Sequence, residues 1–93
     1  MNQQINKQES SQNYANIIMV LGDKHRVIQC RDNIQWILQI HSGEVDGSKR
    51  FRNLSYIRTR GLLIDACRSI HPDITQSELN ILDRLPDVCG VMS

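Results

Sequence analysis

The sequence predicts an α+β fold, in which a three-stranded antiparallel sheet is packed by one helix and flanked by a second, short C-terminal helix. Three patterns carry this prediction. Residues 34–41 alternate between apolar and polar side chains, as a strand with one buried face does. Residues 75–78 read Thr-Gln-Ser-Glu, the capping box that begins many helices. Between these two stretches, apolar residues recur at helical spacing: Leu62, Leu63, Ala66, Cys67 and Ile70.

Residues 1–16 form a polar stretch rich in Gln, Asn and Ser, without apolar periodicity. Burial of so few apolar groups does not offset the chain entropy lost on folding, so we expect a disordered polar tail. Residues 17–93 are expected to form a single small domain. The longest apolar run, residues 17–21, is far shorter than the ~18 residues of a membrane span. Since the N-terminus also has no apolar signal segment, we expect a cytoplasmic protein without a membrane partner.

The strands are predicted from short apolar runs between turn residues. Residues 17–21 are apolar throughout and form either a first strand or an apolar lead-in that packs against the sheet. Residues 25–30 indicate a strand, and residues 31–33 a turn whose Asp and Asn tolerate left-handed backbone. Residues 34–41 give the strongest strand. Trp36 lies in phase with its apolar positions, so we expect this side chain in the core.

The second half of the chain predicts one further strand and two helices. Residues 42–48 contain two glycines and two acids, which is typical of an exposed loop. Residues 51–58 form a third strand with no cleanly apolar face, which favours an edge strand. The first helix begins after Thr59 and ends at His71, because the residue before a proline leaves the helical region. The second helix follows the capping box and ends before Pro86.

The cysteines, histidines and acids show no enzyme or metal-site pattern. Cys30, Cys67 and Cys89 are far apart and odd in number, which indicates free thiols in a reducing compartment. No Cys or His residues have the close paired spacing of zinc ligands. Cys67 and His71 have the spacing of an activated thiol, but Cys67 belongs to the apolar stripe. Because nucleotide-binding and hydrolase motifs are also missing, we expect a non-enzymatic protein without cofactor or metal.

Charge is distributed unevenly along a chain whose formal net charge is only +1. Residues 24–70 carry nine Lys and Arg against four acids, a local net charge of +5. Residues 71–93 carry one Arg against four acids, a net charge of −3. Arg outnumbers Lys eight to three, which favours bidentate recognition of phosphate or carboxylate. The sequence therefore predicts a basic sheet-and-helix unit and an acidic C-terminal end.

The densest group of cations surrounds the third predicted strand. Alternate residues of a strand project from one face, so four even-numbered side chains are expected together: Arg50, Arg52, Tyr56 and Arg58. Arg60 follows in the first helical turn, whose free N–H groups also attract anions. Such a strip would neutralise a phosphate backbone while Tyr56 stacks on a base. A solvated face is the alternative interpretation. The predicted site for nucleic acid or another anionic partner comprises Arg26, Lys49, Arg50, Arg52, Tyr56, Arg58 and Arg60.

Two stretches, HRVIQCRDNIQWILQ and RNLSYIRTRGLLIDACR, give the chain a resemblance to short uncharacterised proteins of proteobacterial genomes and their mobile elements. The resemblance covers roughly residues 25–68: a strand ending near Cys, an IQWI-Q strand, and an RTR segment before a helix. Those proteins have no established activity, so the resemblance implies no functional residues. The predicted element order is also similar to that of ethylene-response-factor-type DNA-binding domains and integrase arm-binding domains. Both of those read DNA with their sheet.

Two functions follow from these expectations. The leading one is a small non-enzymatic binding module that contacts DNA or RNA through a basic sheet face, so that affinity falls steeply with salt. The alternative is a protein-binding inhibitor or adaptor encoded by a phage or mobile element. It would be of the anti-defence type, such as an anti-CRISPR, and would act on a host protein complex. In either case we expect a monomer or a weak homodimer.

Overall fold

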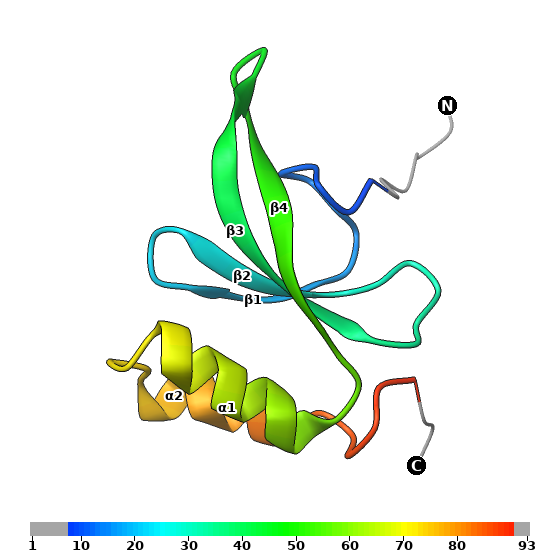
Figure 1. Ribbon diagram of the computed structural model, residues 1–93, viewed down its shortest axis with the longest axis vertical. Helices are drawn as coiled ribbons and strands as arrows, with labels where there is room; N and C mark the ends of the chain where they lie inside the picture. The colour runs from blue at the N-terminus through cyan, green and yellow to red at the C-terminus, as the bar shows by residue number, and fades with distance from the viewer. Residues whose placement is uncertain (1–7, 91–93) are drawn as a thin grey trace.

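The computed structural model describes residues 8–90 and has the α+β fold that the sequence predicts (Figure 1). An antiparallel sheet of four strands runs in the order β1-β2-β3-β4, so each strand pairs with its neighbour in sequence. Both helices lie against one face of this sheet. The elements are β1 (Ile17–Leu21), β2 (His25–Gln29), β3 (Trp36–Val45), β4 (Ser48–Ile57), α1 (Arg60–Ile70) and α2 (Gln76–Asp83).

The prediction of three strands is one strand short, because Ile17–Leu21 pairs with β2 as a strand of its own. Gly22 has a φ of +61°, which lets the chain reverse tightly between β1 and β2. Met19 and Leu21 then project toward the helices and are buried, whereas Val20 projects the other way and is 61% exposed. The apolar run is long enough to form an edge strand with one buried face.

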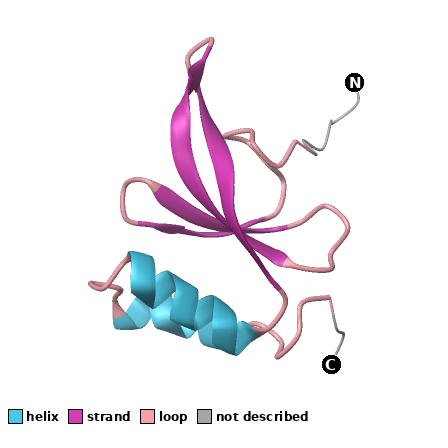
Figure 2. Cartoon of the chain, viewed as in Figure 1, coloured by secondary structure: helices cyan, strands magenta, loops and turns pink. Residues whose placement is uncertain are grey.

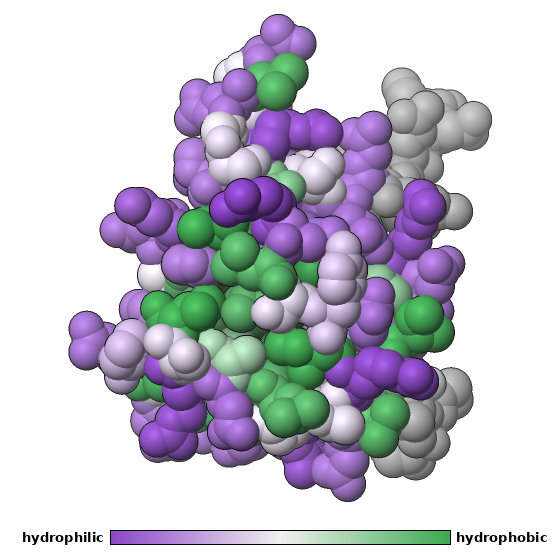
Figure 3. Space-filling view, in the orientation of Figure 1, coloured by the Kyte–Doolittle hydropathy of each residue, from purple (hydrophilic) through white to green (hydrophobic). Residues whose placement is uncertain are grey.

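The β3–β4 hairpin is longer than the sequence predicts. Residues 42–48, predicted as an exposed loop, belong mostly to the two strands, and only Asp46 and Gly47 form the turn. Both turn residues have positive φ, +52° and +80°. Such two-residue turns match the twist of the strands, and Asp-Gly is a preferred pair for them. The outer half of the hairpin therefore projects as an arm (Figure 2). Its surface is mostly hydrophilic, with a hydrophobic group close to the tip (Figure 3), where Val45 is exposed.

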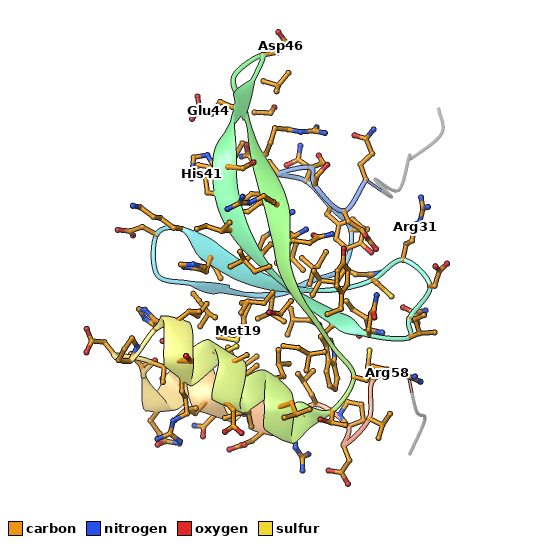
Figure 4. The ribbon with its side chains drawn as sticks, in the orientation of Figure 1. Met19, Arg31, His41, Glu44, Asp46 and Arg58 are labelled. Atoms are coloured by element: carbon orange, nitrogen blue, oxygen red, sulfur yellow. The ribbon has the colours of Figure 1, made fainter. Side chains whose placement is uncertain are left out.

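The helices and the sheet enclose the main core. Thr75 begins α2 as predicted: its Oγ1 accepts from Glu78 N at 3.2 Å, and Glu78 Oε1 accepts from Thr75 N at 2.9 Å. Trp36 is fully buried, as the alternation predicts. Met19 points from the sheet toward the helices (Figure 4). Burial of each large apolar side chain contributes about 1.5–3 kcal/mol. The core comprises Met19, Leu21, Val27, Trp36, Leu38, Ile57, Leu63, Cys67, Leu82 and Cys89.

The opposite face of the sheet is covered by N-terminal residues of the chain itself. Of the predicted disordered tail, residues 1–7 lie outside the described residues, whereas residues 8–16 lie against the sheet. Tyr14 is only 4% exposed, and its hydroxyl donates to Gln29 O at 2.7 Å. Residues 8–13 are here named the strap, the sheet face beneath them the strap face, and the other the helix face. The strap is held by hydrogen bonds and not by apolar side chains. Its polar composition therefore resembles that of a disordered tail, which is why the sequence predicts disorder here.

His25 lies where the β1–β2 turn meets the end of α1. Burial, followed by the charges of His71 and Lys24, lowers the pKa of His25 from its usual 6.5. As the pH falls below 6.5, the unfolded chain therefore binds a proton that the folded protein resists. We expect the free energy of unfolding to decrease below that pH, and His25→Gln to make the decrease shallower. Urea denaturation at a series of pH values measures both slopes, and identical slopes would contradict the prediction.

Candidate functional site

Arg26 is the centre of a hydrogen-bonded cluster on the strap face. Its side chain is only 2% exposed, which is rare for arginine. Its Nε donates to Gln39 Oε1 at 2.7 Å, and its Nη2 donates to Ser11 O at 2.7 Å and Glu9 O at 3.0 Å. Its Nη1 donates to Gln12 O at 3.3 Å. All four acceptors are neutral, and burial lowers the pKa of Arg26 to about 10.

The strap is held by groups from three strands. The guanidinium carbon of Arg26, on β2, lies 3.7 Å from the ring centroid of Phe51, a cation–π contact. Gln39, on β3, is fully buried, and its Nε2 donates to Glu9 O at 2.9 Å. On β4, Phe51 N donates to Ser10 O at 2.9 Å. The strap therefore crosses the sheet and pairs locally with the outer edge of β4 as a short extra strand would.

Two cavities open beside the strap. The larger, of about 330 Å³, is lined by the first strap residues together with Arg31 and Asn53. The smaller, of about 180 Å³, lies near the other end of the strap, where Lys24, Arg26 and Lys49 contribute to its lining. Each cavity combines at least one cation with polar side chains. The strap thus lies between Arg31 on one side and Lys24 and Lys49 on the other, where Asp23 also contributes to the lining.

A β-bulge in β4 divides the predicted strip of cations. Two consecutive residues of β3 pair with Ser55 and Asn53, so Leu54 is an extra residue without a partner in β3. An extra residue reverses the alternation of side chains along a strand. Arg52 therefore projects to the helix face, whereas Tyr56 projects to the strap face. The prediction that these even-numbered side chains share one face is wrong.

Three of the predicted site cations have side-chain partners among the described residues. Arg26 is buried, because the alternation of β2 directs its side chain under the strap. Arg50 is half-buried, and its Nη2 donates to Ser10 Oγ at 3.0 Å. Arg60 Nη2 lies 2.6 Å from Asp87 Oδ1, and its Nη1 donates to Leu85 O at 2.8 Å beyond the end of α2. The other predicted residues are exposed: Lys49, Arg52, Tyr56 and Arg58.

The residues that surround Arg26 were not among the predicted site residues. Lys24 and Arg31 contribute to the overall positive charge of the sequence, but no local pattern places them beside the strap. For Gln39 the alternation of β3 was a usable sequence signal, because it places this side chain on the face opposite Trp36. Asn53 joins the cluster through the bulge: its Oδ1 accepts from Gln39 Nε2 at 2.7 Å.

In the fold, the uneven charge along the sequence gives the sheet layer and the helix layer net charges of opposite sign. Residues 17–58, the sheet and its turns, carry seven cations against four acids, a net charge of +3. Residues 59–90 carry three cations against five acids, a net charge of −2. Two of the sheet acids, Glu44 and Asp46, lie on the outer part of the arm, away from Arg31 and Arg58 (Figure 4). The body of the sheet layer is therefore more basic than its net charge indicates.

The thiols are poorly suited to nucleophilic chemistry. Cys30, Cys67 and Cys89 are all buried and free. Burial raises the pKa of Cys67 to about 11, which disfavours the thiolate that acts as a nucleophile. Among residues 8–90, no three His, Cys, Asp or Glu side chains gather as metal ligands.

No protein-family model, curated protein or solved structure matches this chain. Neither α1 nor α2, the helices of the described part of the chain, is long and apolar enough to cross a membrane.

Proposed function

We propose that the chain is a small nucleic-acid-binding module whose basic sheet layer contacts the phosphate backbone. The observation that supports this proposal is a set of exposed sheet cations that have no ion-pair partner among the described residues. Within residues 8–90, the one ion pair joins Arg60 to Asp87, outside this layer. Binding of phosphates would neutralise the unpaired cations and release counterions. The cations are Lys24, Arg31, Lys49, Arg52 and Arg58.

The test compares two double variants that remove the same charge from opposite layers. Lys24→Ala/Lys49→Ala changes the sheet layer, and Arg68→Ala/Arg84→Ala changes the helix layer; all four side chains are exposed. Labelled single-stranded and duplex DNA and RNA are titrated at about 50 and 200 mM salt. We expect the parent to bind with salt-dependent affinity. The sheet variant should bind roughly tenfold more weakly at low salt, with a log–log salt slope reduced by about 1–2.

The helix-layer variant controls for net charge and is expected to bind nearly as the parent does. Equal losses in both variants would show that net charge, rather than the sheet layer, attracts the nucleic acid. No binding by the parent at about 50 mM salt would overturn the proposed function, because nonspecific contact is the least that such a layer provides.

One observation favours a protein partner as the second candidate. The outer edge of β4 exposes Leu54 (41%) and Tyr56 (60%) between Arg52 and Arg58. An exposed edge strand can pair with a strand of another protein, as an inhibitor of a host protein complex would require. If the parent does not bind nucleic acid but a host protein co-purifies with it, Leu54→Lys should abolish that complex. A complex that survives this change would exclude the β4 edge.

A further inference from the structure

The strap is held by contacts that an anionic ligand can replace. Its residues, Gln-Glu-Ser-Ser-Gln-Asn, include no apolar side chain, so hydrophobic burial contributes little to its attachment. Three of the four acceptors of Arg26 are main-chain carbonyls of the strap. A charged acceptor makes roughly twice as strong a hydrogen bond to a guanidinium as a neutral one. A phosphate in place of these carbonyls would therefore give the buried cation a better partner.

The strap also brings a negative charge to this face. Glu9 Oε2 accepts from Arg31 N at 2.9 Å, at the edge of the larger cavity. Cations lie beyond the strap on both sides, with Arg31 near Glu9 and with Lys24 and Lys49 near Gln12. A polyanion that follows these cations across the sheet must therefore cross the position of the strap.

We propose that the strap is a displaceable cover over a binding site for single-stranded nucleic acid. A phosphate binds Arg26 in place of the strap carbonyls, and a base stacks on Tyr56. This inference rests on the proposed function and specifies its ligand and its regulation. Tyr56 is on the strap face and 60% exposed, and its hydroxyl accepts from Asn53 Nδ2 at 3.0 Å. Single strands offer the unstacked bases that such an aromatic ring recognises, whereas a duplex does not.

The first experiment locks the strap onto the sheet. Ser11 and Arg50 are partners in an antiparallel bridge, and such partners have the Cα separation of about 4.5–5.5 Å that a disulfide spans. We expect oxidised Ser11→Cys/Arg50→Cys to bind an oligothymidylate of about 15 nucleotides at least tenfold more weakly than the same protein after reduction. The reduced protein is the matched control, because it has the same residues and the same charge.

Equal affinities of the oxidised and reduced forms would overturn the inference while leaving the proposed function intact. Tighter binding of a duplex of the same length would also overturn it. That result would assign binding to the β3–β4 arm, since the major groove admits a two-stranded ribbon. Absence of binding by the parent would overturn the proposed function and this inference with it.

A second variant loosens the strap without a disulfide. Glu9→Gln removes the strap carboxylate, so we expect oligothymidylate to bind roughly threefold to tenfold more tightly. Asp32→Asn is the control, because it changes the charge equally beside Arg31 from an exposed position outside the strap. Unchanged affinity of Glu9→Gln, or an equal gain in Asp32→Asn, would contradict displacement of the strap.

Discussion

Arg26→Met is expected to detach the strap from the sheet and to lower the free energy of unfolding by about 2–4 kcal/mol. The arginine donates to acceptors from Gln39 and three strap residues, and Met replaces none of these bonds. Once detached, the strap carbonyls can bond to water, which limits the loss. The buried amide of Gln39 still loses a donor, and Phe51 loses its cation–π contact.

Two measurements separate detachment from global destabilisation. Urea denaturation gives the free energy of unfolding, and hydrogen exchange reports the amides that the strap protects. Phe51 N donates to Ser10 O, and Lys49 N donates to Gln12 Oε1. We expect both amides to exchange rapidly in Arg26→Met while the β2–β3 pairs stay protected.

Two further variants control for charge and shape. Arg31→Met removes an exposed cation of the same layer and should change stability by no more than about 0.5 kcal/mol. Arg26→Lys keeps the charge but not the planar fork, so it should also release the strap. Protection of Phe51 and Lys49 that persists in Arg26→Met would show that the strap is attached independently of the guanidinium.

The helix face could be predicted because its signals are local. Trp36 and Leu38 mark one buried face, although Ile34, in phase with them, precedes β3 and is exposed. The capping residues Thr75 and Glu78 mark the start of α2. Each signal depends on residues within one strand or one helical turn, where side-chain spacing determines the structure directly. The short hairpin turn had an equally local signal in Asp46 and Gly47, but the acids and glycines around it suggested a longer loop.

The strap could not be predicted, because the contacts that hold it are distant in sequence and polar. Arg26 bonds to residues 14 to 17 positions earlier, and Gln39 bonds to Glu9, 30 positions earlier. Polar residues without periodicity are equally typical of a disordered tail and of a segment held by hydrogen bonds. Arg26 is buried, and not exposed as a binding residue, because the strap covers it.

The prediction that Arg50, Arg52, Tyr56 and Arg58 share one face was wrong because it assumed regular alternation along the whole strand. Alternation places every second side chain on the same face only while the pairing is regular. The extra residue Leu54 interrupts it and separates Arg52 from Tyr56. No local sequence pattern marks this bulge, so side-chain orientation beyond it required the observed register. The prediction of an edge strand was independent of the bulge and is confirmed.

Gly90→Ala is expected to detach the C-terminal segment from the β2–β3 turn. Gly90 has a φ of +80°, and a Cβ at this position would lie 2.0 Å from the main-chain oxygen of Asn33. Because the clashing atom belongs to the backbone, no side-chain rotation relieves it. We expect Cys89, now 4% exposed, to react with iodoacetamide at least tenfold faster, while the fully buried Cys67 stays protected.

The loss of stability in Gly90→Ala cannot exceed the free energy that attaches the segment, so we expect about 1–3 kcal/mol. That attachment includes the bond from Cys89 N to Arg58 O at 2.8 Å and the bridge between Thr59 and Val88. Gly61→Ala is the matched control, because a Cβ there meets no atom within 4 Å. It should stabilise α1 by about 0.5–1 kcal/mol and leave the labelling of Cys89 unchanged. Slow labelling of Cys89 in Gly90→Ala would mean that the β2–β3 turn moves aside instead, and faster hydrogen exchange at Asn33 would then reveal that movement.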